Sequence, residues 1–445
     1  MVIKMPKGAK YIIDTLSDAG FDAYAVGGCV RDCLMGRAPT DWDITTQASP
    51  EDIKAIFSGR KMIDIGERHG TIAVSADGKY YEVTTYRIDG SYGDGRRPDS
   101  VSFTDVLQED LQRRDFTINA MAYNDAVGLV DYFGGESDIK QGVIRCVGDA
   151  ALRFSEDYLR IMRAYRFAAV LGFGLTSDVR FAALQMRDNL HNIAVERVQT
   201  EFVKMITTNN FDCIKMFFDD CGPAIFPEIV RLSGVAQNNS YHCHDVYDHT
   251  FAAFAHIAPE AAMRLAALYH DAGKYFTKTT DANGTDHFYG HAKESFKIAE
   301  TALKKWRFDN ATINRALNII KYHDINAGND RMAVKKTLNR LGEGLLRDIL
   351  DFQIADNLAK TQLAKDVKLK EVYRAKKMLD EIIASEEPVH VSKLAVGGKD
   401  IMEVLGIGPS AAIGEYLGLL MDRVLEKPEL NNYDSLVEIL KDLAV

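Results

Sequence analysis

Near the start of the chain, a short apolar run is followed by two glycines and then by two aspartates, and this order restricts what the segment can form. Tyr24-Ala25-Val26 is typical of a buried strand, and Gly27-Gly28 follows it directly. Since glycine has no Cβ, backbone N–H groups at such a turn can approach a triphosphate closely. Asp41 and Asp43 are expected on one face of a strand, where two carboxylates can share Mg²⁺ ions. The pattern predicts a nucleotidyl-transfer site, although an isolated Asp-x-Asp is more often a solvated turn.

The composition argues against a disulfide framework, a structural zinc site and membrane segments. The chain has 445 residues, 47% of them hydrophobic, which suffices for about two to four compact units. Its six cysteines are scattered without paired Cys-x-x-Cys motifs, so we expect a reducing compartment and neither a disulfide framework nor a structural zinc site. No apolar run reaches roughly eighteen residues, so we expect a cytoplasmic protein without membrane segments. The net charge of −10 means that any nucleic acid must contact local arginine clusters.

Two kinds of periodicity divide the chain. Strand-like segments recur up to about residue 135, at 63–65, 71–75 and 80–86, and Asp77-Gly78 between the last two is a hairpin-turn signal. Beyond residue 150 the apolar spacing is helical almost throughout. We therefore expect an α+β fold, in which a head with a small mixed sheet is followed by all-α neck, body and tail regions.

A basic motif follows the strand-like segments. It reads Arg113-Arg114-Asp115-Phe116-Thr117-Ile118-Asn119. The two planar guanidinium groups can neutralise phosphate oxygens, and Asp115 can accept a hydrogen bond from a ribose hydroxyl. The alternative to phosphate binding is a structural role, in which the motif is the charged N-terminus of a helix and the aspartate is its capping residue. Upstream, the polar stretch Asp94-Gly95-Arg96-Arg97-Pro98 indicates a basic loop able to close over a phosphate or an RNA end.

A third motif, Glu156-Asp157-Tyr158-Leu159-Arg160, is predicted to open a helix that continues through Arg163. Asp157 and Arg160 are three residues apart and are expected to share one helical face. Such a pair can be a plain salt bridge, which contributes roughly a few tenths of a kcal/mol. Alternatively, an Asp acceptor beside an Arg donor can pair with the edge of a nucleobase.

In this order, over roughly residues 20–205, the motifs resemble those of the class II tRNA nucleotidyltransferases, the bacterial CCA-adding enzymes and their poly(A) polymerase relatives. The resemblance implies a polymerase-β-like catalytic head in which Asp41 and Asp43 hold Mg²⁺. It also implies that Asp157 and Arg160 select CTP and then ATP. The candidate nucleotide-binding residues from the motifs and the resemblance together are Gly27, Gly28, Arg31, Arg113, Arg114, Asp115, Asn119, Asp157, Arg160 and Arg163.

Histidines concentrate in the second half of the chain. His270-Asp271 follows an apolar helical run, and Gly273 is expected to end that helix and leave the pair at the mouth of a pocket. The pattern resembles the HD phosphohydrolases, whose ligands are a His, a His-Asp pair and a distant Asp, with extra histidines and a bridging Asp in two-metal members. The metal ligands that the resemblance implies are His249, His270, Asp271, His291, His323 and Asp356. His242 and His244 lie near enough in sequence to take the first position instead.

Imidazole and carboxylate ligands suit Mn²⁺, Fe²⁺, Ni²⁺ and Zn²⁺, so we expect a second divalent metal whose identity the sequence leaves open. The resemblance to HD proteins implies hydrolysis of phosphoesters, including 2′,3′-cyclic phosphates at damaged RNA ends. The alternative is a helical scaffold that carries the tRNA body.

The expected domains are a nucleotidyltransferase head (1–135), a helical neck and body (136–238), an HD domain (239–365) and a helical tail (366–445). The resemblance implies template-independent addition of C, C and A to the tRNA 3′ end from CTP and ATP. Alternatives within the family are a poly(A) polymerase and enzymes that add only CC or only A. Outside it, the alternatives are a metal phosphohydrolase with an RNA-binding head and a non-catalytic RNA chaperone. The sequence indicates no oligomeric state.

Overall fold

The computed structural model of the chain describes residues 3–66, 70–90, 100–385 and 387–443. The chain divides into two compact units, Met1–Pro227 and Glu228–Val445, and each is described by itself. The basic loop predicted at 94–98 lies outside the described residues. The finer division into head, body, HD domain and tail stays a prediction.

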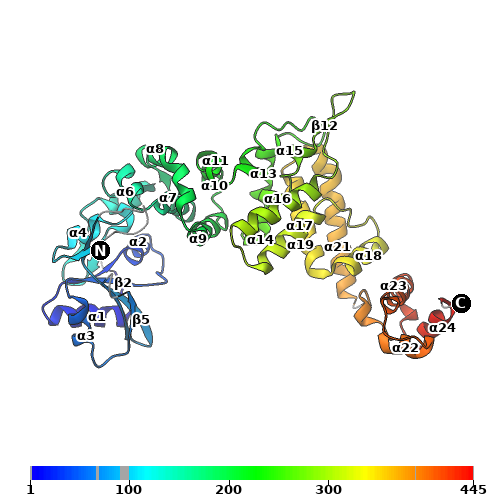
Figure 1. Cartoon of the computed structure of the whole chain (residues 1–445), viewed down its shortest axis with the longest axis horizontal. Coiled ribbons are helices and arrows are strands. Elements are labelled where there is room, and N and C mark those ends of the chain that lie inside the picture. The colour runs from blue at the N-terminus through cyan, green and yellow to red at the C-terminus, as the bar shows by residue number, and fades with distance from the viewer. Residues whose placement is uncertain (1–2, 67–69, 91–99, 386, 444–445) are drawn as a thin grey trace. The chain divides into compact units, whose positions relative to one another are not determined.

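A seven-stranded sheet dominates the first part of the first unit, with the strand order β3-β4-β5-β2-β1-β8-β9 (Figure 1). Its strands are β1 (Ala23–Val26), β2 (Asp43–Thr46), β3 (Met62–Gly66), β4 (Thr71–Ala76), β5 (Lys79–Thr85), β8 (Ala122–Asn124) and β9 (Gly128–Val130). The β2–β5 pair is parallel and the other neighbouring pairs are antiparallel. The predicted mixed sheet is therefore confirmed.

The turn between β4 and β5 shows how local sequence fixes the pairing of two strands. Asp77 and Gly78 both have positive φ, at 51° and 75°, which Asp and Gly tolerate better than most residues. Ala76 pairs with Lys79 across this two-residue turn. The hairpin predicted at Asp77-Gly78 is confirmed.

All residues of β1 are buried, and alternate residues of this strand serve cores on the two sides of the sheet. Ala25 belongs to a core that includes residues of α1 (Lys7–Asp18) and α3 (Pro50–Ile56). Val26 belongs to a second core that includes residues of α4 (Leu107–Gln112). Because side chains of a strand alternate between faces, packing on both sides holds β1 firmly at the end where the glycine turn begins.

The remaining elements of the first unit connect the strands of the sheet or follow it in the chain. They are α2 (Gly28–Leu34), β6 (Arg87–Asp89), β7 (Val101–Phe103), η2 (Thr117–Asn119), α5 (Gly135–Gln141), β10 (Val143–Ile144), α6 (Ala150–Glu156), α7 (Leu159–Leu171), β11 (Gly174–Leu175), α8 (Ser177–Met186), η3 (Arg187–Asn192), α9 (Val195–Ile206), α10 (Phe211–Asp220) and α11 (Gly222–Ile225). Buried rings of Phe202, Phe217, Phe218 and Phe226 pack together and join α9 to α10 and α11.

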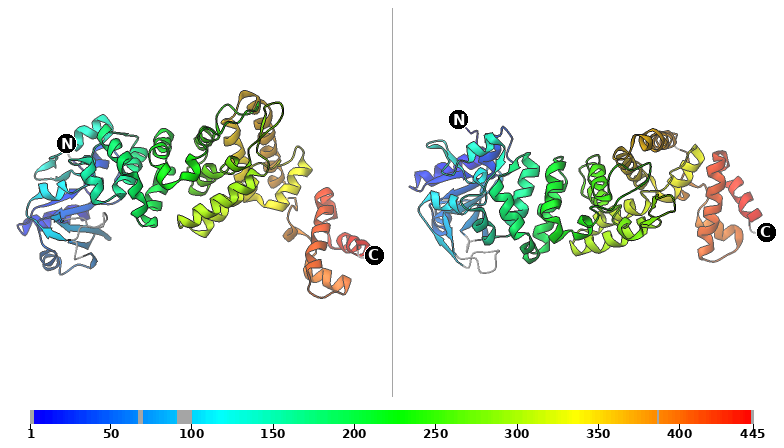
Figure 2. Two further views of the ribbon diagram at one scale, coloured as in Figure 1. Left: turned by 45° about the horizontal axis from the view of Figure 1, so that its top comes forward. Right: turned by 90° about the horizontal axis from the view of Figure 1, so that it is seen from above.

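The second unit is predominantly helical, as the further views of the ribbon show (Figure 2). Its elements, with the short α12 (Pro227–Val230) preceding them, are α13 (Val246–Phe254), α14 (Ala261–Tyr269), α15 (Lys274–Thr277), β12 (Thr279–Thr280), β13 (Asp286–His287), α16 (His291–Lys305), α17 (Asn310–Tyr322), α18 (Arg331–Leu341), α19 (Glu343–Leu358), α20 (Gln362–Ala364), η4 (Lys365–Leu369), α21 (Lys370–Ala384), η5 (Val391–Lys393), α22 (Gly398–Leu405), α23 (Ala411–Glu426), η6 (Pro428–Leu430) and α24 (Tyr433–Leu443). Among the described residues, no helix has the length and apolar character needed to span a membrane.

Candidate functional site

The candidate site of the first unit lies where β1 ends and β2 begins. Val26, the last residue of β1, pairs with Asp43, the first residue of β2. Gly27 follows with a φ of 79°, a conformation that favours glycine, and turns the chain into α2. Asp41 is exposed and precedes β2, so the expectation that one strand carries both aspartates is wrong for Asp41. The reason is that β1 ends at Val26 and offers no further pairing to residues before Asp43.

Glu82 of β5 is a third carboxylate at this place, and the sequence analysis did not single it out. The parallel pairing of β2 with β5 sets Glu82 beside Asp43. Burial raises the pKa of Glu82, and the charges of Asp43 and Asp41 raise it further. Burial also raises the pKa of Asp43, against the opposing influence of Arg114. Acidic oxygens that disfavour one another's charge in this way fit a site for a divalent cation.

The two arginines of the basic motif are held by Asp110, a buried residue that sequence reasoning missed. Arg113 donates from Nε and Nη2 to Asp110 Oδ1 at 3.0 and 2.7 Å. Arg114 Nη2 lies 3.5 Å from Asp110 Oδ2, which also accepts from Thr45 at 3.1 Å. Although burial raises the pKa of Asp110, Arg114 and Arg113 bring it below its usual value. The signal available in the sequence is the spacing of Asp110, three and four residues before the arginines.

Four of the predicted nucleotide-binding residues form one hydrogen-bonded network. Arg163 Nε donates to Asp115 Oδ2 at 2.7 Å, and Asn119 Nδ2 donates to Asp115 Oδ1 at 3.3 Å. Asn119 Oδ1 accepts from Arg31 Nη1 at 2.6 Å. Burial opposes the charge of Asp115, but Arg163 and Arg160 lower the pKa of this carboxyl to about 2. Both oxygens of Asp115 already accept hydrogen bonds within the protein, so its contact with a ribose hydroxyl stays a prediction.

Arginines also gather around the buried ring of Phe167. The guanidinium carbons of Arg166, Arg31 and Arg163 lie 3.6, 5.2 and 5.3 Å from the ring centroid. Each of the three arginines also pairs with a carboxylate, Arg166 with Glu201, Arg31 with Asp32 and Arg163 with Asp115. The cation–π contacts therefore fix the orientation of arginines whose charge is largely balanced within the protein.

The third motif opens a helix that continues through Arg163 as predicted, but the helix begins later than predicted. Glu156 is the last residue of α6, Asp157 is extended with φ −147° and ψ 104°, and α7 begins only at Leu159. Arg160 contacts Glu156, and Arg197 of α9 donates to Asp157 Oδ2 at 2.8 Å. Asp157 and Arg160 therefore do not pair with each other, and each has another partner, Arg197 and Glu156 respectively. The reason is that the break between α6 and α7 turns the Asp157 side chain toward α9.

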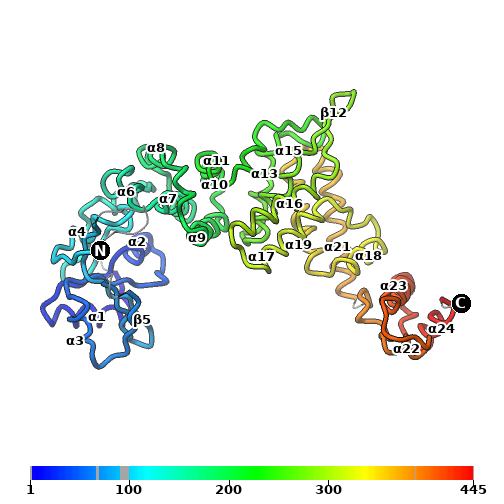
Figure 3. Tube along the Cα trace, viewed as in Figure 1, coloured from blue at the N-terminus to red at the C-terminus, as the bar shows by residue number. Residues whose placement is uncertain are grey.

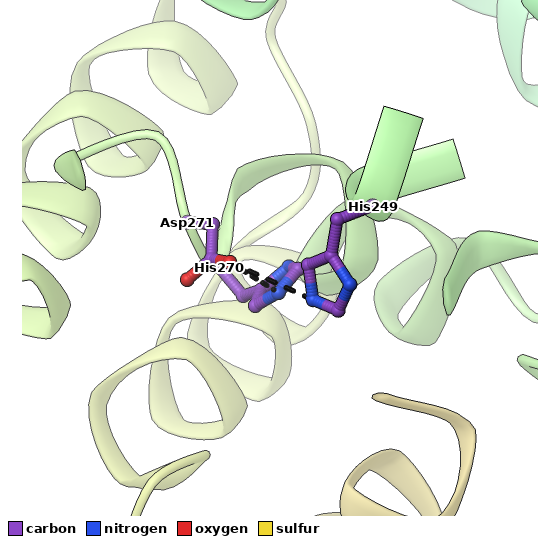
Figure 4. A group of neighbouring side chains, drawn as sticks. All are labelled: His249, His270 and Asp271. Atoms are coloured by element: carbon purple, nitrogen blue, oxygen red, sulfur yellow. Dashed lines mark ion pairs between the residues drawn. The ribbon is translucent and has the colours of Figure 1, made fainter. Parts of the chain in front are cut away.

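In the second unit, five helices bring the six predicted metal ligands together. The residues, in order of helix, are His249 within α13, His270 and Asp271 after α14, His291 at the start of α16, His323 after α17 and Asp356 within α19. Figure 4 shows how His249 and His270 lie toward Asp271. The helix α14 ends at Tyr269, directly before the His-Asp pair as expected, but Gly273 does not end it. Gly273 has a φ of −72° and precedes α15, and a Cβ there would lie 2.3 Å from the His291 carbonyl oxygen.

Three imidazoles are oriented by the backbone so that Nε2 faces Asp271. In His270, His291 and His323, Nδ1 lies 2.8, 2.9 and 2.8 Å from the carbonyl oxygen three residues earlier. The three Nε2 atoms lie 3.2, 3.4 and 3.9 Å from a carboxylate oxygen of Asp271. A carbonyl that accepts from Nδ1–H leaves the Nε2 lone pair available to a metal.

Five of the six residues form two candidate ligand groups that share one carboxylate, and Asp356 belongs to neither group of the described residues. Asp271 groups with His249 and His270, and separately with His291 and His323; in each group the ligand atoms lie within 4.8 Å of one another. Within the described residues, His270 Nε2 is buried and has no hydrogen-bond partner. Nitrogen and carboxylate donors in this arrangement fit divalent transition metals. The group therefore has the composition of a candidate two-metal centre.

Two lysines accompany the carboxylates of this centre. Lys274 Nζ lies 2.7 Å from Asp271 Oδ2, and Lys360 Nζ lies 2.5 Å from Asp356 Oδ2. His249 Nε2 lies 2.8 Å from Asp356 Oδ1. Burial raises the pKa of both carboxyls, but the neighbouring cations hold both values well below the usual range. The carboxylates are therefore in the charged form that ligates metals.

Two further residues lie next to the centre. Asp324 was missed in the sequence, although it repeats the His-Asp dipeptide; its Oδ2 lies 3.1 Å from His291 Nε2. The His242 ring stacks edge-on against His249, with centroids 4.9 Å apart. Within the described chain, His242 is in neither candidate ligand group, whereas His249 belongs to one of them, so His249 stays the predicted first ligand.

The centre opens into a cavity of about 890 Å³. Its lining includes His291, His323, Asp356, Lys274 and Lys360. The cavity wall thus combines candidate metal ligands with two cationic side chains. A site of this chemistry can hold a phosphate ester.

Three family models match the chain. Residues 23–145 match the poly A polymerase head domain, residues 172–229 match the "Probable RNA and SrmB- binding site of polymerase A", and residues 241–361 match the HD domain. The resemblance that the motifs indicated is confirmed.

Curated relatives and solved structures agree with these matches. A CCA-adding enzyme of Leuconostoc mesenteroides is 50% identical over 198 residues, 44% of this chain and 49% of the relative. One of Geobacillus stearothermophilus is 51% identical over 195 residues, 44% of this chain and 48% of the relative. The chain thus spans about half the length of the curated relatives it matches.

Two solved structures cover nearly the whole chain. The Bacillus stearothermophilus CCA-adding enzyme in complex with CTP is similar at 28% identity with a TM-score of 0.69, over 99% of this chain and 98% of that one. The Thermotoga maritima CCA-adding enzyme complexed with tRNA shares the fold at 20% identity and a TM-score of 0.62, over 98% and 94%.

Proposed function

We propose that this chain, a member of the tRNA nucleotidyltransferase and poly(A) polymerase family that also contains an HD domain, adds C, C and A to the tRNA 3′ end from CTP and ATP. The observation that carries the proposal is the meeting of the Gly27 turn, Asp43 and Glu82 at one end of the sheet. The arginine network around Asp115 and Asp110 supports it, since it supplies fixed cations for a triphosphate.

Asp41 and Asp43, with Glu82 beside them, are the residues that would hold Mg²⁺. When bound, Mg²⁺ supplies positive charge that stabilises the triphosphate and the departing pyrophosphate. Arg113 and Arg114, oriented by Asp110, would neutralise the remaining phosphate oxygens. In the reaction the RNA 3′-oxygen bonds to the α-phosphorus of the nucleotide, and pyrophosphate leaves.

Selection of the base depends, in this proposal, on the edge presented by Asp157 and Arg160. Arg197→Gln is expected to lower the ratio of kcat/KM for CTP over UTP by roughly tenfold, because it removes the donor that fixes Asp157. The ratio is measured by single-nucleotide extension of a tRNA transcript. Lys204→Gln, an exposed charge change on the same helix, is the control. An unchanged ratio in Arg197→Gln contradicts a positioning role for Arg197.

The glycine turn makes a second prediction. Gly27→Ala is expected to lower the free energy of unfolding by about 1–3 kcal/mol, because φ 79° with ψ −127° is a backbone conformation that residues with a Cβ rarely adopt. It is also expected to raise the KM for CTP, because the added Cβ would lie 3.0 Å from Arg114 Nη1. Gly36→Ala is the control, since its φ is 71° but a Cβ there has no described atom within 4 Å. Urea unfolding and steady-state incorporation separate the two effects; equal KM values in both variants argue against the contact.

The proposed activity is tested with three tRNA transcripts that lack CCA, lack only the terminal A, or are complete. Each receives Mg²⁺ with CTP, ATP or both, and products are read at single-nucleotide resolution. Addition that stops after CCA supports the proposal. Long A tails indicate a poly(A) polymerase, and CC-only or A-only products indicate a divided pathway. Binding without extension indicates an RNA-binding head beside a phosphohydrolase.

For the second unit we propose divalent-metal-dependent hydrolysis of phosphoesters, with 2′,3′-cyclic phosphates at RNA ends as the substrate. The residues that would hold the metals are the two groups that share Asp271. When bound, such ions polarise a phosphoryl oxygen. Lys274 and Lys360 at the same cavity support binding of a phosphate. Metal-loaded protein that leaves a nucleoside 2′,3′-cyclic phosphate intact overturns this part of the proposal.

A further inference from the structure

The turn that follows the β12–β13 hairpin places an exposed aromatic ring at the cavity of the histidine centre. Tyr289 is 79% exposed, the highest value among the large apolar and aromatic side chains of the described residues. It lines the same cavity as His291, His323 and Asp356. A single exposed ring is ordinary on a protein surface, but a ring on the wall of this cavity can contact a planar group of a bound molecule.

The ring of Tyr289 stacks on the ring of His287. Its ring is nearly parallel to that of His287, with an interplanar angle of 7° and centroids 5.3 Å apart. Tyr289 Oη lies 3.4 Å from His287 Nδ1, and His287 Nε2 lies 3.0 Å from Asp281 Oδ2. These contacts hold the ring plane, while its high exposure leaves it accessible to another planar group.

The hairpin is anchored rather than loosely attached. Asp286 is buried and accepts hydrogen bonds from Thr280 Oγ1 at 2.7 Å and from the Asn238 backbone N–H at 2.9 Å. Lys278 Nζ lies 2.8 Å from the same carboxylate. Figure 3 shows the trace of this hairpin standing out from the helices of the second unit. Tyr289 therefore follows an anchored hairpin and lies two residues before the first residue of α16, so its backbone has a defined position.

Tyr289 is also close along the chain to the candidate metal centre. Only Gly290 separates it from His291, so their Cα atoms are at most about 7 Å apart. A nucleotide joins a phosphate to a planar base through one sugar, and every base offers a face for stacking on an aromatic ring. An aromatic platform beside a phosphate site matches that construction.

We infer that Tyr289 stacks on the nucleobase of the nucleotide whose phosphate occupies the histidine centre, and that this contact lets the second unit accept nucleoside phosphates irrespective of the base. The inference rests on the proposed phosphoesterase function. In that reaction water adds to phosphorus, one P–O bond of the cyclic ester breaks and a phosphomonoester forms. Tyr289 takes no part in these bond changes and acts on substrate binding alone.

The test compares substrates with and without a base on the Mn²⁺-loaded full chain. Tyr289→Ala is expected to raise the KM for cytidine and adenosine 2′,3′-cyclic phosphates alike, by roughly fivefold to a hundredfold, with kcat unchanged. The KM for methyl riboside 2,3-cyclic phosphate, which has no base, is expected to stay at its wild-type value. Tyr289→Phe should behave as wild type, and Tyr433→Ala, an exposed tyrosine in α24, is the matched control.

Calorimetric binding of cytidine 2′-monophosphate and of methyl riboside 2-phosphate gives a readout that does not require turnover. Weaker binding of the cytidine compound alone by Tyr289→Ala supports the inference, even if wild type hydrolyses neither ester and the proposed phosphoesterase function fails. Equal effects on both compounds, or no effect on either, overturn the inference. Melting curves of Tyr289→Ala check that folding is intact.

Discussion

Replacing Asp43 with asparagine is expected to lower the rate of nucleotide addition by roughly a thousandfold or more, which corresponds to at least about 4 kcal/mol of transition-state stabilisation. Asp43 is the first residue of β2 and adjoins the glycine turn and Glu82. The substitution keeps the side-chain shape but removes the negative charge that would attract Mg²⁺. Folding should be preserved, since Asp43 is the exposed first residue of its strand and the substitution keeps the side-chain volume.

The measurement is single-turnover extension of a tRNA transcript that lacks CCA, at saturating CTP and Mg²⁺. Asp18→Asn is the control, because Asp18 is an exposed carboxylate at the end of α1. Glu82→Gln is expected to lower the rate at least about tenfold if the third carboxylate takes part. An Asp43→Asn rate within tenfold of wild type contradicts the assignment of Asp43 to catalysis.

The strands of the head could be predicted because their signals are local. The run 71–75, the run 80–86 and the Asp77-Gly78 turn between them contain the alternation and the positive-φ residues that a hairpin requires. Pairing between distant strands has no such signal. Glu82 therefore escaped notice, because its place beside Asp43 depends on the parallel pairing of β2 with β5, which no short window of sequence reveals.

The Asp157 motif shows a different limit. Its spacing is that of a helical pair, but the chain breaks between α6 and α7 at this residue. The partner that competes for Asp157 is Arg197, forty residues later in the chain. An ion pair between residues i and i+3 of a helix contributes only roughly a few tenths of a kcal/mol. The ion pair between Asp157 and Arg197 can therefore form in its place.

The histidine residues were easier to predict than their geometry. The resemblance to HD proteins supplied the six residue positions, and helix ends then explain why they meet: His270 and His323 follow the last turns of α14 and α17, and His291 begins α16. What the sequence did not reveal is the use of backbone carbonyls to orient each Nδ1. Asp324 was also not predicted, because only the folded structure brings it close to His291.

Replacing Asp271 with asparagine is expected to remove both metal ions of the second unit, because Asp271 belongs to both candidate ligand groups. The loss in affinity should exceed about a hundredfold at each site, since even residues that only support metal ligands are worth roughly tenfold to a hundredfold. His323→Gln should remove one ion, because His323 belongs to only one group. Metal content per chain, measured by inductively coupled plasma mass spectrometry after dialysis, distinguishes the two variants.

Asparagine at position 271 also leaves Lys274 without the carboxylate 2.7 Å away, so Asp271→Asn is expected to unfold at a lower temperature. Nucleotide addition by the same preparation is the internal control, because it depends on the first unit. We expect that activity to remain within about twofold of wild type while cyclic phosphate hydrolysis is lost. Equal metal content in Asp271→Asn and His323→Gln contradicts a bridging role for Asp271, since a shared carboxylate must affect two sites where a single histidine affects one.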